Sequence, residues 1–133
     1  MHRHSGLRLR LQAQPQSARL LRQRLSLWLD ELGARSDEIF DLSLASTEAF
    51  VNAVEHPHEP TADVIEVEGN LDGRTITITV RDHGSWRQHR KRQGGGYGLP
   101  LMRQLMNIVE VHTQPEGTLI TMQRQLTRPR RFR

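Results

Sequence analysis

Apolar and polar residues alternate near the start of the chain and then change to a helical spacing. Leu7, Leu9 and Leu11 alternate with polar residues, the period of two that is typical of a strand with one buried face. Pro15 suits the first turn of a helix, and from there apolar residues recur every three or four positions as far as Gly33, a helix stop. The pattern predicts an edge strand followed by an amphipathic helix.

A second helix is predicted directly after the first. Ser36 is a suitable cap, and two acidic residues follow it where they face the positive end of the helix dipole. The apolar spacing continues to about His56. Pro57 ends the helix, because the residue before a proline avoids the helical conformation.

The remainder of the chain predicts two hairpins, with a glycine-rich loop and a short helix between them. Asp72-Gly73 separates the strands 64–71 and 75–81, and such a dipeptide is a strong hairpin signal. In the second of these strands isoleucine and valine alternate with threonine, which gives the strand one apolar and one polar face. A helix is expected over 99–106, and a closing hairpin follows it.

This order of elements defines the expected fold class. Helices segregated from a mixed, mostly antiparallel sheet indicate an α+β protein, a two-layer α/β sandwich with the helices on one face. At 133 residues the chain fits a single domain, 1–133. We expect its core over about 7–126 and a basic, disordered tail at 127–133. The glycine-rich segment 94–98 comes late and lacks the βαβ unit of a Rossmann or P-loop site.

Composition and charge argue against several classes of protein. The chain has no cysteine, so it can form neither a disulfide framework nor a thiolate metal site. No apolar run reaches the ~18 residues of a membrane span and no signal-peptide core is visible, so we expect a cytoplasmic protein without membrane contact. The net charge is +4, but aromatic residues do not interleave with the basic ones, which argues against direct nucleic-acid binding.

Two polar residues of the predicted second helix form the first candidate site. Glu48 and Asn52 are four residues apart, so they lie on one helix face about one turn apart. A carboxylate accepts a proton from an attacking hydroxyl, and an amide oxygen ligates a hard cation such as magnesium. Such pairs also occur on many solvated helix faces, so the spacing alone leaves both readings open.

Asp82 and the glycine-rich loop extend this candidate site. Asp82 follows a predicted strand and precedes Gly84 in a turn, where its carboxylate could accept a hydrogen bond from an exocyclic amine such as that of adenine. A plain turn aspartate is the alternative. The backbone N–H groups of 94–98 precede a helix and could bind phosphates at the positive end of its dipole, with a flexible linker as the alternative.

In this order, the motifs resemble the four sequence boxes of the GHKL ATPase superfamily. The segment 48–56 resembles the N box, 80–84 the first glycine box, 96–102 the second, and Gly117-Thr118 the final box. The similarity is greatest to the anti-sigma-factor serine/threonine-protein kinase branch and covers about residues 7–126. It implies the Bergerat ATP-binding fold, with ATP and Mg²⁺ as cofactors.

The resemblance implies a role for each matching residue. Glu48 would be the catalytic base for a protein serine hydroxyl, Asn52 the magnesium ligand and Asp82 the carboxylate that reads adenine. The further residues expected to contact the nucleotide are Gly84, Trp86, Gly94, Gly96, Gly98, Leu99 and Thr118.

The resemblance also implies partners. A protein of this branch phosphorylates an anti-anti-sigma (STAS-type) protein and sequesters a sigma factor, so that the two partners exchange. Homodimers are common in the branch, and the apolar residues of the first strand and helix offer a surface for one.

The chain departs from the family pattern in the loop between the glycine boxes. Trp86 stands where the first box has its second glycine, and the lid from Trp86 to Gly94 is short and basic. Trp86 either stacks on the adenine or ribose, or packs to close the shortened lid. The alternative function is therefore a module that sequesters its partner, with or without bound ATP, and has no kinase turnover.

Overall fold

The computed structural model describes residues 6–55, 64–83 and 98–127. Within these ranges the elements follow the order that the sequence predicts, and the two hairpins and the short helix are all present. The elements are β1 (Gly6–Gln12), α1 (Ser17–Glu31), α2 (Ser36–Glu55), β2 (Val64–Asp72), β3 (Thr75–Asp82), α3 (Gly98–Leu105), β4 (Ile108–Gln114) and β5 (Gly117–Gln125).

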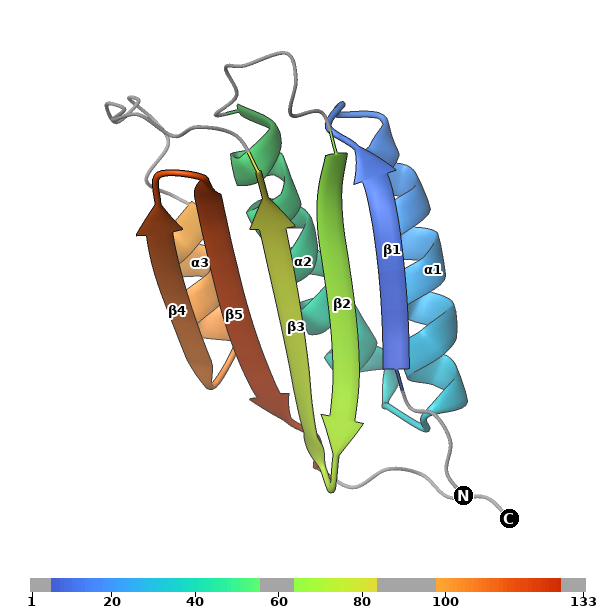
Figure 1. Cartoon of the computed structure of the whole chain (residues 1–133). Coiled ribbons are helices and arrows are strands. Elements are labelled where there is room, and N and C mark those ends of the chain that lie inside the picture. Colours follow the sequence, from blue (N-terminus) through green and yellow to red (C-terminus); the bar gives the residue numbers. More distant parts are fainter. Residues whose placement is uncertain (1–5, 56–63, 84–97, 128–133) are drawn as a thin grey trace.

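The strands form one sheet in the order β1-β2-β3-β5-β4. The three helices in the described ranges cover the same face of this sheet, with α1 behind β1, α2 behind the centre and α3 behind β4 and β5 (Figure 1). The two-layer α+β prediction is confirmed, and β1 lies at an edge as expected. Each pairing among the described strands is antiparallel, so the parallel component of the expected mixed sheet is not found there.

Alternating side chains separate the buried face of the sheet from the polar one. Ile76, Ile78 and Val80 of β3 are buried under the helices, while the threonines between them are only half-buried on the opposite face. Burial of an aliphatic side chain of this size contributes roughly 1.5–3 kcal/mol. The fully buried side chains of greatest volume include Phe50, Leu21, Leu25, Leu29, Leu42, Ile65, Met102 and Met122.

The predicted helix stop and hairpin turn lie where two glycines adopt positive φ angles. Gly33 follows α1 with a φ of 88°, and Gly73 follows β2 with a φ of 66°. Both conformations favour glycine because it has no Cβ. Pro15 lies in the turn before α1, whose first residue is Ser17, so the helix begins two residues later than predicted.

The start of α2 differs from the prediction by one residue. Ser36 is already helical, and the first backbone bond runs from Ile39 N to Arg35 O at 2.9 Å, so Arg35 takes the cap position. Instead of a serine hydroxyl, the Glu38 carboxylate caps the entry by accepting a hydrogen bond from Arg35 N at 2.9 Å. A carboxylate three residues into a helix commonly reaches back in this way.

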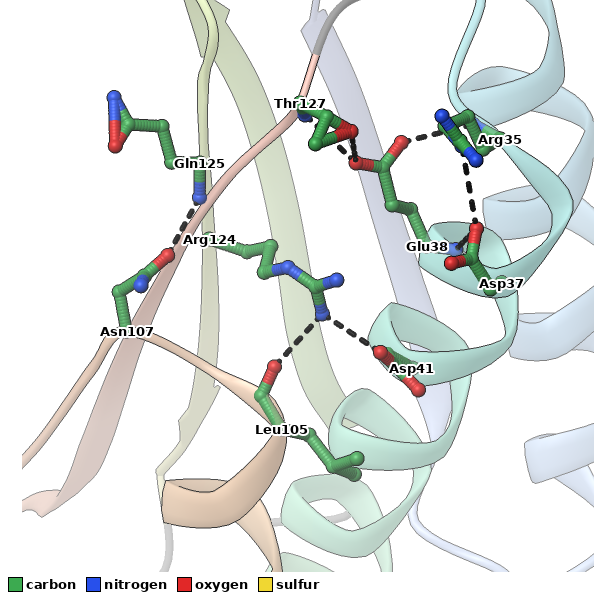
Figure 2. A network of polar contacts seen from close by, with 9 residues as sticks. All are labelled: Arg35, Asp37, Glu38, Asp41, Leu105, Asn107, Arg124, Gln125 and Thr127. Carbon is green, nitrogen blue, oxygen red and sulfur yellow. Dashed lines mark hydrogen bonds and ion pairs between the residues drawn. The ribbon is translucent and has the colours of Figure 1, made fainter.

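The same carboxylate joins α2 to the chain that follows β5 (Figure 2). Thr127 donates to Glu38 Oε2 from its backbone N at 2.8 Å and from its hydroxyl at 2.7 Å. Glu38 is 2% exposed, and this burial disfavours its charged form. The hydrogen bonds from Arg35 and Thr127 and the positive charge of Arg124 favour the charged form more strongly. They hold the pKa of Glu38 below its ordinary value of 4.5.

None of the helices in the described ranges has the length and apolarity that crossing a membrane would require.

Candidate functional site

Four elements meet at one edge of the sheet, where α2 and β3 end and α3 and β5 begin (Figure 1, top). We call this the site edge and define it by Asn52, Asp82, Gly98 and Thr118. The opposite end of the same elements, defined by Glu38, Leu105, Arg124 and Thr127, we call the far edge. Residues that are distant in the sequence come together at the site edge because the strands and the helices α2 and α3 run antiparallel.

Glu48 and Asn52 of α2 face the first residue of α3. Both side chains are half-buried, and Gly98 is buried against them. A Cβ added to Gly98 would lie 2.9 Å from Asn52 Nδ2 and 3.4 Å from Glu48 Oε1. The lack of a side chain at Gly98 therefore lets α3 begin directly against both polar groups, and the structure brings these three predicted residues together.

Asp82 and Thr118 form a second pair of predicted residues at the site edge. They are opposite each other in the register of β3 and β5 and are 9% and 8% exposed. The Thr118 hydroxyl oxygen is buried and has no hydrogen-bond partner among the residues that the structure describes. Because an unpaired hydroxyl in a protein interior is unfavourable, this oxygen suits a bond to a ligand or a water molecule.

Gly117 permits the close approach of β5 to the end of β3. A Cβ at this position would overlap the backbone carbonyl of Asp82. Gly117 belongs to the segment that resembles the final box, and the resemblance implies no structural role for it. The signal available was a glycine directly before a strand, which often marks a close approach of two backbones.

Other predicted residues lie at or beyond the limits of the described chain. Leu99 is half-buried and packs against the core directly after Gly98. The predicted residues and clusters outside the described ranges are Gly84, Trp86, Gly94, Gly96, His56 and the basic positions Arg87, Arg90, Lys91 and Arg92.

A magnesium ion would receive few ligands from the described residues. No group of three or more acidic, histidine or cysteine side chains that could hold a metal gathers among them. Magnesium is commonly held by one or two protein oxygens together with phosphate oxygens and water. The oxygen of the half-buried Asn52 amide is of the type that such a site uses, and it lies beside the start of α3.

The chain is similar to known proteins over most of its length. A family model described as a histidine kinase-like ATPase domain matches residues 11–124. The serine-protein kinase RsbW of Bacillus licheniformis is 32% identical over 136 residues, which covers 89% of this chain and 84% of that protein. The anti-sigma F factor of Anoxybacillus flavithermus is 23% identical over 136 residues, which covers 92% of this chain and 93% of that protein.

A solved structure is also similar. The crystal structure of the RsbU and RsbW domains of a Mycobacterium tuberculosis protein superposes with a TM-score of 0.78 and 30% sequence identity. The match covers 96% of this chain but 34% of that longer chain, so the similarity spans about a third of it.

Proposed function

This chain belongs to the histidine kinase-like ATPase domain family, and we propose that it is an ATP- and magnesium-dependent protein serine kinase that also acts as an anti-sigma factor. The observation that carries the proposal is the meeting of Glu48, Asn52 and Gly98 at the site edge. A proton acceptor, a magnesium ligand and the glycine that begins a helix lie there within reach of one bound triphosphate.

In the proposed site, the adenine end of the nucleotide binds at Asp82. Its carboxylate accepts a hydrogen bond from the exocyclic amine, and the buried Thr118 hydroxyl completes the polar surface beside it, directly or through a water molecule. The low exposure of both residues strengthens these bonds, because little water competes with them. Adenine recognition therefore depends on the pairing of β3 with β5.

The phosphate end binds where α3 begins. The backbone N–H groups at the start of α3 and the positive end of its dipole attract the phosphates, and Leu99 anchors this turn in the core. We include Gly84, Trp86, Gly94 and Gly96 in the proposed nucleotide site on the resemblance of their motifs. Asn52 would hold the magnesium ion, which would supply positive charge that stabilises the phosphoryl group being transferred.

Glu48 acts as the base of the proposed reaction. Its carboxylate accepts the proton of a serine hydroxyl while the serine oxygen forms a bond to the γ-phosphorus of ATP. The bond from that phosphorus to the β–γ bridging oxygen breaks, so the products are phosphoserine and ADP. The proton remains on Glu48 until it is released to solvent.

The proposed partners are a STAS-type anti-anti-sigma protein, which carries the serine, and a sigma factor. This part of the proposal is supported by the names of the relatives, anti-sigma F factor and serine-protein kinase RsbW. We further propose a cytoplasmic single domain over about residues 7–126 and a homodimer.

Titration with a fluorescent ATP analogue, with and without magnesium, tests the nucleotide site. We expect Asp82→Asn to weaken binding about 100-fold, since a hydrogen bond to a charged group contributes about 1.5–3 kcal/mol. Asn52→Ala should remove the dependence on magnesium. Asn70→Ala, on the exposed part of β2, is the matched control and should bind as the wild type does. If the wild-type protein binds no nucleotide, the alternative function applies, a module that sequesters its partner without a nucleotide.

Phosphotransfer to a STAS-type partner tests the kinase. Glu48→Gln should slow transfer by about 10²–10⁴-fold, the contribution expected of a general base, with the Kd for ATP within about twofold of the wild type. Glu68→Gln, an exposed carboxylate on β2, is the control. Equal transfer rates in Glu48→Gln and the wild type would place the base elsewhere.

A further inference from the structure

Arg124 of β5 connects the two helices that form the site edge, but it does so at the far edge. One guanidinium nitrogen, Nη1, donates to Asp41 Oδ2 of α2 and to the carbonyl oxygen of Leu105 in α3, both at 2.9 Å. Figure 2 shows the arginine lying between the two helices. The side chains of Arg124 and Asp41 are 19% and 28% exposed, so water and salt screen this ion pair less than a surface pair.

The contact with Leu105 satisfies a group that the helix itself leaves open. Leu105 is the last residue of α3, and the final carbonyls of a helix have no partner within it. A positive charge is also favourable at this negative end of the helix dipole. Arg124 thus fixes the C-terminal end of a helix only eight residues long.

The spacing along both helices carries this constraint to the site edge. Asp41 and Glu48 are seven residues apart on α2, and Leu105 and Gly98 are seven residues apart on α3. Seven residues make nearly two turns and about 10.5 Å, so each pair lies on one face of its helix. The helices are therefore joined at two matched levels, by Arg124 at the far edge and by the contact of Gly98 with Glu48 and Asn52 at the site edge.

We propose that Arg124 is a positioning residue that sets the start of α3, and with it Gly98, against Glu48 and Asn52. A short helix moves as a rigid unit, so a change in the position of Leu105 changes the position of Gly98. Gly98 packs closely against Asn52, since a methyl group added at Gly98 would lie 2.9 Å from the Asn52 amide nitrogen. The consequence for phosphate binding rests on the proposed function. The positioning of α3 by Arg124 does not depend on that function.

Nuclear magnetic resonance of the amides tests the geometry without any nucleotide. In Arg124→Gln we expect the Gly98 N–H and the Asn52 side-chain NH₂ signals to shift. The matched control is Arg74→Gln, because Arg74 also donates to a carbonyl at 2.9 Å, but the acceptor is Thr127 after β5 and not a residue of α3. It should leave both signals in place. Unchanged signals in folded Arg124→Gln would overturn the proposal.

The conservative variant keeps the test usable if Arg124→Gln does not fold. Arg124→Lys retains the positive charge for Asp41 but offers a single ammonium in place of the planar guanidinium. We expect it to shift the same two signals by a smaller amount. A folded Arg124→Lys with both signals at their wild-type positions would count against the proposal.

Nucleotide affinity tests the functional consequence. Arg124→Gln should raise the Kd for Mg-ATP about tenfold, as a misplaced binding group does. The Kd for adenosine should not change, because Asp82 and Thr118 are held by the pairing of β3 with β5 and not by α3. A general loosening of the fold would weaken both ligands equally and overturn the proposal. If the wild type binds no ATP, the proposed function fails, and the amide signals still decide whether Arg124 positions α3.

Discussion

The two ends of α2 carry similar polar side chains in different surroundings. At its start the Glu38 carboxylate is 2% exposed and accepts hydrogen bonds from Arg35 and Thr127 at 2.7–2.9 Å. Near its end Glu48 and Asn52 are half-buried and face the glycine that begins α3. The far edge satisfies the Glu38 carboxylate from within the fold, whereas the site edge has a buried Thr118 hydroxyl without a partner among the described residues. The difference separates a residue that holds the helix from residues that we propose bind a nucleotide.

If this comparison is right, replacing Glu38 affects stability and not binding. Glu38→Gln should lower the free energy of unfolding at pH 7 by about 2 kcal/mol. The glutamine NH₂ group is a donor, and it would face a donor where the wild type has an accepting carboxylate oxygen. Urea denaturation measures this difference, and the Kd of the folded protein for ATP should not change. Glu110→Gln on the exposed strand β4 is the control.

The pH dependence of this difference has a defined sign. The folded pKa of Glu38 is lower than 4.5, so its contribution is fully present above that pH and is lost as the pH falls through the folded pKa. The stability gap between the wild type and Glu38→Gln should therefore narrow below pH 4.5. A stability difference that stayed constant below pH 4.5 would contradict the proposed role of the Glu38 charge.

At the site edge, Gly98→Ala should affect nucleotide binding more than stability. The added methyl group displaces the Asn52 amide, which is the end of a movable side chain, so we expect the free energy of unfolding to change by no more than about 1 kcal/mol. The Kd for Mg-ATP should rise about tenfold. Gly6→Ala is the matched control, since a Cβ there meets only Gly69 O at 3.8 Å. Full ATP affinity in Gly98→Ala would show that this contact is not part of the site.

The smallest effect should come from Thr118→Val. Removing a buried hydroxyl that has no partner in the described residues should raise the free energy of unfolding by about 1 kcal/mol without ligand. The same change should weaken ATP binding about fivefold, because the hydroxyl no longer meets the nucleotide. Thr121→Val on the polar face of β5 serves as the control. A loss of stability in Thr118→Val would mean that the hydroxyl supports the fold.

Periodicity was sufficient to predict the elements and the layers from the sequence. The alternation of Ile76, Ile78 and Val80 with threonines predicted which face of β3 is buried, and the structure confirms it. The spacing of Glu48 and Asn52 placed both on one face of α2, because that relation is local to a helix. Relations of this kind depend on a few adjacent residues and are visible in the sequence.

Contacts between distant residues could not be predicted in the same way. Nothing near Glu38 indicates that Thr127 donates two hydrogen bonds to it, since the two residues are 89 positions apart. The link from Arg124 to Asp41 and Leu105 likewise appears only when β5 lies beneath α2 and α3. The one-residue shift of the α2 cap differs from these contacts, because the carboxylate that accepts the Arg35 N–H is only three residues away and is a local signal.

The strand order also affects when the proposed nucleotide site forms during synthesis. β5 is the last described strand to be made, yet it lies inside the sheet between β3 and β4. Asp82 meets Thr118, 36 residues further along the chain, only when β5 inserts. Such distant pairings form late, because a long loop must close first. A nascent chain that already has Glu48, Asn52 and Asp82 therefore still lacks Thr118 at the proposed adenine site, so we expect nucleotide binding only after the sheet is complete.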